Sequence, residues 1–295
     1  MVAGSCTDPE LAERKNAVIL THPGKSEMAE TKERVAIRTG AGSGLGRAMA
    51  KDFVDHGIRC VLTGRRLNAL EQTVDMISGD RSRMLIVQSD VTVAADRSRI
   101  VSECIASFGR VDILVNNAGI SFIAPLLAHE EKEWRQVMNT NLDSHFFMAK
   151  EVIPRMRDQN FGRIINIASI YGTLASNNDL YGDLMPSANE HGLGPTRQPG
   201  YHTSKGGVLT LTMDLAVAVA RWGITVNAIS PGMFMTEQTE HIVNEHVIEK
   251  VKSMTPVGRF GEPHEVAHAV RFLASEDASF ITGVNLRVDG GWSLW

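Results

Sequence analysis

Short apolar runs recur along this chain from residue 35 onward, and each is followed by glycine or polar residues and then by a helix-length segment. The runs cover residues 35–37, 59–63, 84–88, 111–115, 163–167, 225–229 and 284–288. Apolar runs of this length are typical of strands in a parallel sheet that is covered on both faces. The alternation therefore predicts an α/β fold, with a doubly wound parallel sheet in a single three-layer α/β/α domain.

A glycine-rich turn follows the first run and opens the helical segment 45–56. Glycine tolerates positive φ and lets a ligand approach the backbone closely. The start of a helix presents free N–H groups and the positive end of its dipole to a pyrophosphate. Because the turn lies between a strand and a helix, it is in the context that binds a dinucleotide. The candidate cofactor residues of this turn are Gly40, Ser43, Gly44, Leu45 and Gly46.

The second run ends at Gly64-Arg65-Arg66, where a dinucleotide enzyme usually contacts the adenosine ribose. An acidic residue there would bind the 2′-hydroxyl of NAD(H), and none is present. A guanidinium suits a 2′-phosphate instead. We therefore predict NADP(H) rather than NAD(H), with Arg65 as the contact. Arg66 is equally consistent with a solvated residue at a helix start.

Tyr201 and Lys205 are four residues apart, which places them on one face of a helix. A nearby cation favours the phenolate and lowers the pKa of the tyrosine. A phenol tuned in this way exchanges a proton with a substrate oxygen near neutral pH. Most pairs with this spacing are only part of a solvated helix face, so the pair gains weight from the motifs around it.

Taken together in chain order, these motifs resemble those of the short-chain dehydrogenase/reductase family, over roughly residues 32–292. The matching residues are Thr39-Gly40-x-x-x-Gly44-x-Gly46, Asp90-Val91, Asn116-Asn117-Ala118-Gly119, Asn141, Ser169, Tyr201-x-x-x-Lys205 and Pro231-Gly232. The resemblance implies a Rossmann-type fold and the interconversion of a carbonyl and an alcohol with NAD(P).

The resemblance also implies a role for each catalytic residue. Tyr201 would be the general acid in reduction and the base in oxidation, and Ser169 would hydrogen-bond the substrate oxygen. Lys205 would hold the nicotinamide ribose and lower the pKa of Tyr201. Asn141 would hold a water that relays protons to Lys205. The further cofactor residues that it implies are Asp90, Val91, Asn117, Ala118, Gly119, Tyr201, Lys205, Pro231, Gly232 and Thr236.

Two features depart from the family pattern. Arg38 occupies a strand position where an apolar residue is expected, and an unpaired charge there is costly. It either reaches the cofactor phosphates or is satisfied by a partner. In addition, 32 positions separate Ser169 from Tyr201, where the family usually has about a dozen.

The extra length between Ser169 and Tyr201 is rich in glycine, proline and polar residues, and it predicts a loop insertion near 180–200. Such a loop is either a lid over the substrate, with Arg197 or His191 as anion contacts, or a passive surface insertion. Tyr181 is rejected as the catalytic tyrosine because position 185 is methionine.

Composition limits the remaining possibilities. Residues 1–31 precede the first strand and are predicted to be a flexible tail, followed by the domain at 32–295. The net charge of −4 argues against nucleic-acid binding, and no segment is apolar enough for a membrane span. Three cysteines without paired spacing suggest a reducing, cytoplasmic location. The aromatic end, Trp292 to Trp295, predicts an interface of a homotetramer or homodimer.

We therefore predict an NADP(H)-dependent oxidoreductase that interconverts a secondary alcohol and a ketone by hydride transfer. Residues 231–265 resemble sugar-acid and polyol dehydrogenases of the gluconate 5-dehydrogenase type, and also 3-oxoacyl-carrier reductases. A non-catalytic dinucleotide-binding protein is a second possibility. A third is a zinc protease, because His264-Glu265-x-x-His268 matches the metalloprotease pattern. No third zinc ligand is evident, so no metal is predicted.

Overall fold

The computed structural model has one seven-stranded sheet in which all neighbouring strands are parallel, in the order β3-β2-β1-β4-β6-β8-β9. It describes residues 33–78, 80–187, 192–237, 239–240 and 243–295. The strands are β1 Val35–Thr39, β2 Arg59–Gly64, β3 Met84–Gln88, β4 Ile113–Asn116, β6 Gly162–Ile167, β8 Ile224–Pro231 and β9 Asn285–Val288. Each predicted run therefore forms a strand of the predicted parallel sheet, with ends that differ by a few residues.

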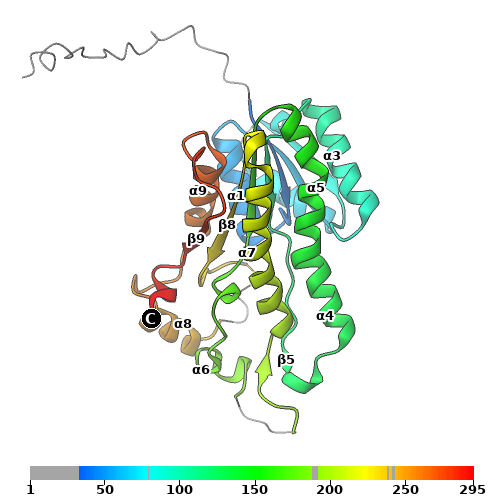
Figure 1. Ribbon diagram of the computed structural model, residues 1–295. Helices are drawn as coiled ribbons and strands as arrows, with labels where there is room; N and C mark the ends of the chain where they lie inside the picture. The colour runs from blue at the N-terminus through cyan, green and yellow to red at the C-terminus, as the bar shows by residue number, and fades with distance from the viewer. Residues whose placement is uncertain (1–32, 79, 188–191, 238, 241–242) are drawn as a thin grey trace, which may run out of the picture. The chain divides into compact units, whose positions relative to one another are not determined.

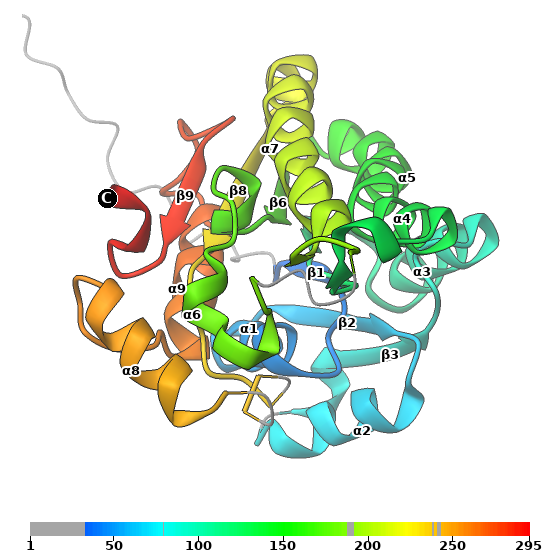
Figure 2. The same cartoon turned by 90° about the horizontal axis from the view of Figure 1, so that it is seen from below.

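Helices cover both faces of the sheet, as its wholly buried central strands require (Figure 2). One apolar core packs α1 Gly44–Asp55, α2 Leu67–Met76 and α9 Pro263–Ala274 against one face. A second core packs α3 Ala94–Phe108, α5 Ser144–Asp158 and α7 Pro199–Val219 against the other. The predicted three-layer α/β/α fold is confirmed for the described residues. The predicted tail, 1–31, lies outside them.

The sheet order reverses between β1 and β4, because the chain runs outward from β1 to β2 and β3 and then returns to β4 on the other side. Loops that leave the carboxyl ends of these two strands diverge and open a crevice, which is where doubly wound sheets bind ligands. The glycine-rich turn after β1 and Asn117 after β4 both lie at this end. The topology alone therefore brings together motifs that are far apart in the sequence.

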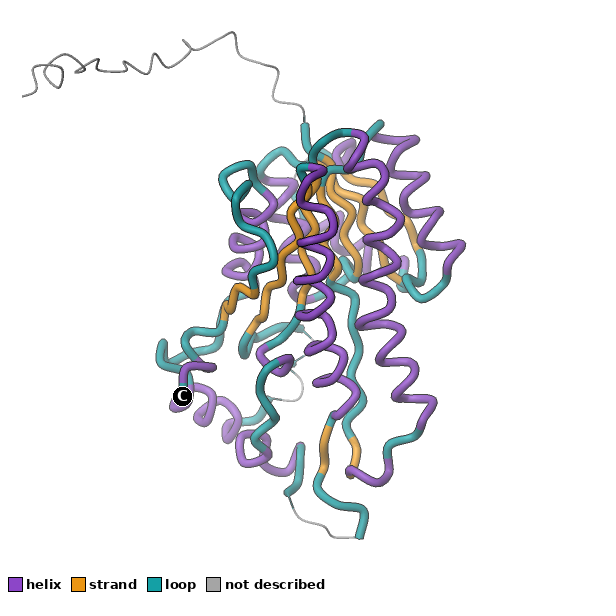
Figure 3. Tube along the Cα trace, viewed as in Figure 1, coloured by secondary structure: helices purple, strands orange, loops and turns teal. Residues whose placement is uncertain are grey.

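The predicted insertion is more ordered than a loop. It contains α6 Asn178–Tyr181, the 3-10 turn Gly182–Leu184 and the short strand β7 Thr196–Arg197, which pairs antiparallel with β5 Ala124–Pro125. With α8 Glu245–Met254, these elements lie beyond the end of the main sheet (Figure 1 and Figure 3). The remaining helix, α4 Glu131–Met138, runs through a π-helical turn, Asn139–Asp143, into α5.

Arg38 neither reaches the cofactor site nor has a hydrogen-bond partner among the described residues, so both expectations from the sequence are wrong. Its side chain is 1% exposed and lies under α1, with the guanidinium carbon 4.5 Å from the centre of the Phe53 ring. None of its three guanidinium nitrogens has a hydrogen-bond partner among the described residues. It is also absent from the lining of the ligand crevice, so it does not reach the cofactor site. Burial lowers its pKa to about 10.

Candidate active site

A cavity of about 890 Å³ extends along the crevice at the carboxyl ends of the strands. Apart from Asn141, all the predicted site residues line it. On the cofactor side these are Gly40, Ser43, Gly44, Leu45, Gly46, Arg65, Asp90, Val91, Asn117, Ala118, Gly119, Pro231, Gly232 and Thr236, and on the reaction side Ser169, Tyr201 and Lys205. The fold therefore gathers residues from both halves of the chain at one continuous site.

The turn after β1 can be built only with glycine. A Cβ on Gly46 would lie 2.0 Å from the carbonyl oxygen of Gly40, and Gly40 itself has a φ of +66°. Asn117 holds the turn from the neighbouring strand, because its Nδ2 donates to the carbonyl oxygens of Thr39 and Gly40 at 3.0 Å each. The start of α1, which follows Ser43, therefore faces the cavity with its N–H groups, as a pyrophosphate site requires.

At the far end of the cavity, Arg65 and Arg66 follow β2 and are exposed. Among the residues that the structure describes, neither guanidinium forms an ion pair or a hydrogen bond. Asp90 also lines this end, and its Oδ1 accepts from the backbone N–H and the hydroxyl of Thr92. This end of the cavity has a local positive charge, because its two guanidiniums have no partner in the described part of the chain and its one carboxylate is already hydrogen-bonded within its own turn. A positive charge suits a phosphate better than a ribose hydroxyl.

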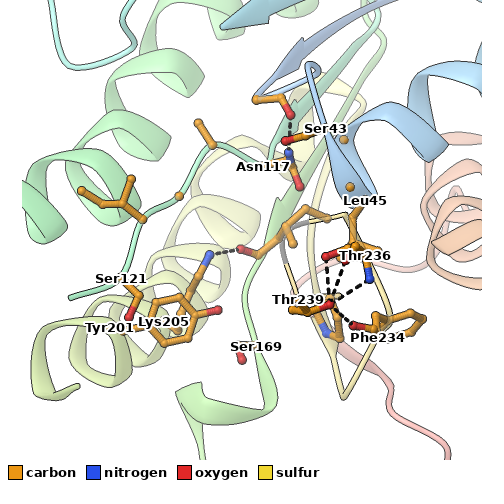
Figure 4. A pocket seen from close by; sticks show the side chains of 18 of the residues that line it. Ser43, Leu45, Asn117, Ser121, Ser169, Tyr201, Lys205, Phe234, Thr236 and Thr239 are labelled. Carbon is orange, nitrogen blue, oxygen red and sulfur yellow. Dashed lines mark hydrogen bonds between the residues drawn. The ribbon is translucent and has the colours of Figure 1, made fainter. Parts of the chain in front are cut away.

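The reacting groups come from β6 and α7. Tyr201 and Lys205 lie one turn apart on α7, and Ser169 follows the end of β6 (Figure 4). Lys205 is 3% exposed and its Nζ donates to the carbonyl oxygen of Ile167 at 2.6 Å, while lying 5.7 Å from the centre of the Tyr201 ring. The Ser169 hydroxyl accepts from the backbone N–H of Tyr171 at 3.1 Å, so this bond does not use the hydroxyl proton.

The predicted direction of the Tyr201 pKa is wrong for this structure. Burial has the largest effect and raises the pKa of the Tyr201 phenol, and a hydrogen bond with Ser169 lowers it in part. Burial also lowers the pKa of Lys205 to about 8. A buried ammonium whose proton is held more weakly is a poorer source of positive charge, and Lys205 is not among the causes that shift the pKa of Tyr201.

Asn141 lies behind the cavity lining, in the π-helical turn between α4 and α5, and it is fully buried. Its side chain accepts from the backbone N–H of Ile120 at 2.8 Å and donates to the Ile120 carbonyl at 2.9 Å. A Cβ on Gly119 would lie 3.5 Å from Asn141 Oδ1 and 3.7 Å from Lys205 Nζ. Asn141 therefore fixes the chain that follows β4 and places its amide on the same side of that chain as the lysine.

The chain after β8 closes the cofactor side of the cavity. A Cβ on Gly44 would lie 3.5 Å from the Cβ of Thr236, so Thr236 faces the glycine-rich turn directly. The backbone N–H of Thr236 donates to the hydroxyl of Thr239 at 2.8 Å, and that hydroxyl donates in turn to the Phe234 carbonyl (Figure 4). This small network holds Thr236 against the crevice, where the cofactor would lie.

Comparison with known proteins agrees with this geometry. The family model described as enoyl-(acyl carrier protein) reductase matches residues 40–293. The chain is 34% identical over 258 residues to the 3-oxoacyl-acyl-carrier-protein reductase FabG of Vibrio cholerae, covering 88% of this chain and 96% of that protein. The chain belongs to the short-chain dehydrogenase/reductase family. It is therefore an NAD(P)-dependent oxidoreductase.

Other relatives in the family act on different molecules. A dehydrogenase subunit of Thauera aromatica, named for (2S)-[(R)-hydroxy(phenyl)methyl]succinyl-CoA, is 34% identical over 262 residues, which is 89% of this chain and 97% of that one. A solved Agrobacterium tumefaciens structure, assigned as a gluconate dehydrogenase, matches with a TM-score of 0.77 and 32% identity, over 88% of this chain and 96% of that one. Because these names span carrier-bound, aromatic and sugar compounds, similarity alone does not choose a substrate.

Several residues of the reaction side were not predicted as site residues. They come from the insertion, from α8 and from the segments that flank these helices, and they are Tyr171, Tyr181, Leu184, Met185, Gln198, Met233, Val243, Val247 and Phe260. Tyr181 was weighed only as a catalytic tyrosine. The signal that could have revealed the larger role is composition, because the chain has only three tyrosines and all three lie between residues 171 and 201.

The structure does not support Arg197 as an anion contact of the insertion. The Nη1 of Arg197 donates to the Ser176 carbonyl and to Asn178 Oδ1, and Arg197 does not line the main cavity. Its charge is therefore committed to holding the insertion together. His191 lies outside the described residues.

The metalloprotease pattern serves a structural purpose in this short-chain dehydrogenase. Glu265 accepts from both terminal nitrogens of Arg259 and from the backbone N–H of Glu262 at the start of α9. These contacts lower its pKa to about 2, so it is a poor general base. Within the described ranges there is no group of three histidine, cysteine, aspartate or glutamate residues that could hold a metal ion. Nor is any described helix long and apolar enough to cross a membrane.

Proposed function

We propose that this protein interconverts a secondary alcohol and a ketone by hydride transfer, with NADP(H) as the cofactor. One observation carries the proposal: the glycine-rich turn, the exposed Arg65 and the Ser169–Tyr201–Lys205 set line a single cavity. Gly40 and Gly46 let the turn pack tightly on itself and on Asn117 at the edge of this cavity, where a Cβ on either would clash with protein atoms. A bound nicotinamide dinucleotide supplies the hydride, and the protein supplies orientation and the proton.

The side chains divide the work at the substrate oxygen. When a ketone is reduced, negative charge develops on its oxygen, and two O–H donors at that position stabilise the charge. Ser169 supplies one hydrogen bond and Tyr201 supplies the other together with the proton. The raised pKa of Tyr201 keeps the phenol protonated near neutral pH, which is the form that reduction needs. Lys205 lies one helical turn from Tyr201, and Asn141 lies on the same side of the Gly119 chain as the lysine, so we assign both to restoring the Tyr201 proton.

The choice of NADP(H) rests on the adenosine end of the cavity. Arg65 and Arg66 are exposed there, and the segment Gly64-Arg65-Arg66 carries no acidic residue that would bind a ribose 2′-hydroxyl. A guanidinium forms strong, directed hydrogen bonds with a 2′-phosphate.

Similarity offers two candidate substrates for this reaction. One is a sugar acid or polyol, as for the gluconate-type relative, and the other is a 3-oxoacyl group, as for FabG. A non-catalytic dinucleotide-binding protein is the alternative class. It is disfavoured because a protein that only binds a dinucleotide needs neither a buried lysine next to a tyrosine nor a serine hydroxyl at the same cavity.

We further propose that the protein is a homotetramer or homodimer in a reducing compartment such as the cytoplasm. Trp134 on α4 and the adjacent Phe146 and Phe147 on α5 are exposed aromatic residues that would suit contact with a second copy. At the C-terminal end Trp292 is buried in its own subunit, so Leu294 and Trp295, which are 77% and 80% exposed, remain for a partner there. Cys60 and Cys104 are buried free thiols. Light scattering that gives a monomer would remove the oligomer proposal.

The first experiment is a titration of the purified protein with NADPH and NADH, followed by tryptophan fluorescence. Stronger binding of NADPH, followed by its oxidation on addition of a ketone, is the expected result. Equal or NADH-favoured binding would overturn the cofactor preference but leave the reaction intact. Binding of a dinucleotide without turnover of any ketone or alcohol would favour the non-catalytic alternative.

A further inference from the structure

All three tyrosines of the chain line the same cavity, although the proposed reaction uses only one. Tyr171 lies in the 3-10 turn after Ser169, and Tyr181 ends α6 in the insertion. Their hydroxyl oxygens are 2.5 Å apart. Both phenols are close enough to Tyr201 for its charge to influence their ionisation. A hydroxyl pair therefore lies beside the catalytic phenol, and the hydride-transfer chemistry gives it no task.

A network behind the pair fixes its position. The backbone N–H of Ser176 donates to Nε2 of His202 at 3.1 Å, so Nε2 is an acceptor and the ring proton is on Nδ1. Nδ1 then donates to the carbonyl oxygen of Gln198 at 2.9 Å. The His202 ring lies 4.9 Å from that of Tyr171, centre to centre. Because His202 follows Tyr201 directly on α7, the network couples the position of the phenol pair to that of the catalytic tyrosine.

The rest of the reaction side is mainly apolar, and its polar residues Ser121 and Gln198 hydrogen-bond each other. Leu184 and Met185 from the insertion face the cavity, as do Val243 and Val247 at α8 and Phe260. These side chains leave few polar groups for a ligand, and the Tyr171–Tyr181 pair is the main concentration of hydroxyl groups away from Ser169 and Tyr201. A site of this composition selects an apolar ligand with a small number of fixed polar contacts.

Charge is almost absent from this side. Among the described residues that line the cavity, the only arginine, lysine, histidine, aspartate or glutamate side chains are Arg65, Arg66, Asp90 and Lys205. The first three lie at the adenosine end, and Lys205 is held by the Ile167 carbonyl. A carboxylate or phosphate on the substrate would therefore enter an apolar wall without a described cation to pair with, which is costly.

We propose that the Tyr171–Tyr181 pair is a second polar anchor, and that the substrate is an uncharged, mainly apolar ketone or secondary alcohol with a second oxygen atom bound by this pair. The inference rests on the proposed function, because the first oxygen must be the one that Ser169 and Tyr201 contact. Two phenols that share one hydrogen bond keep a further O–H and free lone pairs. The pair is therefore able to bind either a second carbonyl or a hydroxyl.

The test compares matched substrates in the presence of NADPH. Acetophenone is compared with 3-hydroxyacetophenone, 4-hydroxyacetophenone and 4-acetylbenzoate, and cyclohexanone with cyclohexane-1,4-dione. We expect at least one hydroxy or dione compound to exceed its parent in kcat/KM by about tenfold, the effect of one good hydrogen bond to a buried site, and the carboxylate to be the poorest. No advantage for a second oxygen, or preferred turnover of the carboxylate, would overturn the proposal.

Substitutions of the two tyrosines test whether the preference for a second oxygen depends on this pair. Tyr181→Phe should remove most of the advantage of the second oxygen, mainly through KM, while affecting the parent ketones much less. Tyr171→Phe should do the same, and Trp222→Phe, an exposed aromatic site outside the cavity, should keep the wild-type ranking. Melting temperature and NADPH affinity show that each variant is folded. An equal loss for the parent and oxygen-bearing substrates would reduce the pair to a structural role and refute the anchor.

A binding measurement separates this inference from the proposed reaction. Calorimetric titration of the NADPH-loaded protein with cyclohexane-1,4-dione and cyclohexanone needs no turnover. If no ketone is reduced but the dione binds more tightly and loses this advantage in Tyr181→Phe, the reaction assignment fails and the anchor stands. If ketones are reduced but the dione has no binding advantage, the reaction stands and the anchor fails.

Discussion

The Nζ of Lys205 donates a 2.6 Å hydrogen bond to the carbonyl oxygen of Ile167, the last residue of β6. This contact joins the helix that carries Tyr201 to the strand that precedes Ser169. The two groups that would hold a substrate oxygen are therefore positioned by one buried ammonium, in addition to any contact that this ammonium makes with a cofactor. Its burial has a second consequence, because the folded protein holds the Lys205 proton weakly.

Lys205 should make stability depend on pH above neutrality. Its pKa is about 8 in the folded protein and returns to its ordinary value near 10.5 on unfolding. Between these values the unfolded chain binds more protons, so this residue's contribution makes the free energy of unfolding rise with pH by at most about 1.4 kcal/mol per pH unit. The contribution is lost as pH falls through 8. Urea unfolding of Lys205→Met over this range should lack the rise. An unchanged slope would contradict the assignment.

Tyr201→Phe should lower kcat by about 10²–10⁴-fold, because it removes the proton donor while keeping the ring and its packing. NADPH affinity should stay near the wild-type value. The paired measurement is steady-state ketone reduction and a fluorescence titration with NADPH. A variant that keeps more than a tenth of the activity would show that another group transfers the proton.

The three tyrosines should ionise at a higher pH in the folded protein than in the unfolded chain. Burial is the main cause that raises the pKa of Tyr171, Tyr181 and Tyr201. Because the chain has no other tyrosine, tyrosinate absorbance reports on this cavity alone. Near pH 10, where an unperturbed tyrosine ionises, the folded protein should show less ionisation than the unfolded chain. These phenols therefore stabilise the fold below that pH and lose the contribution as pH rises further. A normal titration of all three in the folded protein would contradict their burial.

Arg65→Ala should weaken NADPH binding by about 10- to 100-fold, the range expected for a hydrogen bond to a charged group, and leave NADH binding nearly unchanged. Both dissociation constants come from fluorescence titrations. Arg81→Ala is the matched control, since Arg81 is exposed, pairs with Asp75 and lies outside the cavity lining. Equal losses for the two dinucleotides would refute a contact with the 2′-phosphate.

Arg38→Met should stabilise the protein by about 1–4 kcal/mol, because an apolar side chain replaces a buried guanidinium that has no hydrogen-bond partner among the described residues. Urea unfolding at neutral pH measures the change. Arg163→Met is the control: Arg163 is also buried, but it donates to the backbone carbonyls of Ser275 and Gly162, so its loss should destabilise. A destabilised Arg38→Met variant would show that the Phe53 contact outweighs the desolvation of the charge.

The sequence by itself determined the parallel sheet, the cofactor side of the cavity and the three reacting residues Ser169, Tyr201 and Lys205. The apolar runs identify the strands, because a strand that is buried on both faces of a sheet has apolar side chains on both sides. The glycine-rich turn was readable because a side chain on Gly46 would overlap the Gly40 carbonyl, a constraint that acts within seven residues. The Tyr201–Lys205 pair was also predictable from the sequence, because its two residues are only one helical turn apart.

Tertiary structure decided what depends on distant partners. The pKa of Tyr201 could not be predicted from Lys205 alone, because burial by other elements has the larger effect. Arg197 was a candidate anion contact if the insertion were a lid, but its guanidinium donates to Ser176 and Asn178 instead. The Tyr171–Tyr181 pair and the apolar wall of α8 come together only when the insertion folds over the end of the sheet. Local patterns constrain the backbone, whereas burial and side-chain pairing are properties of the assembled fold.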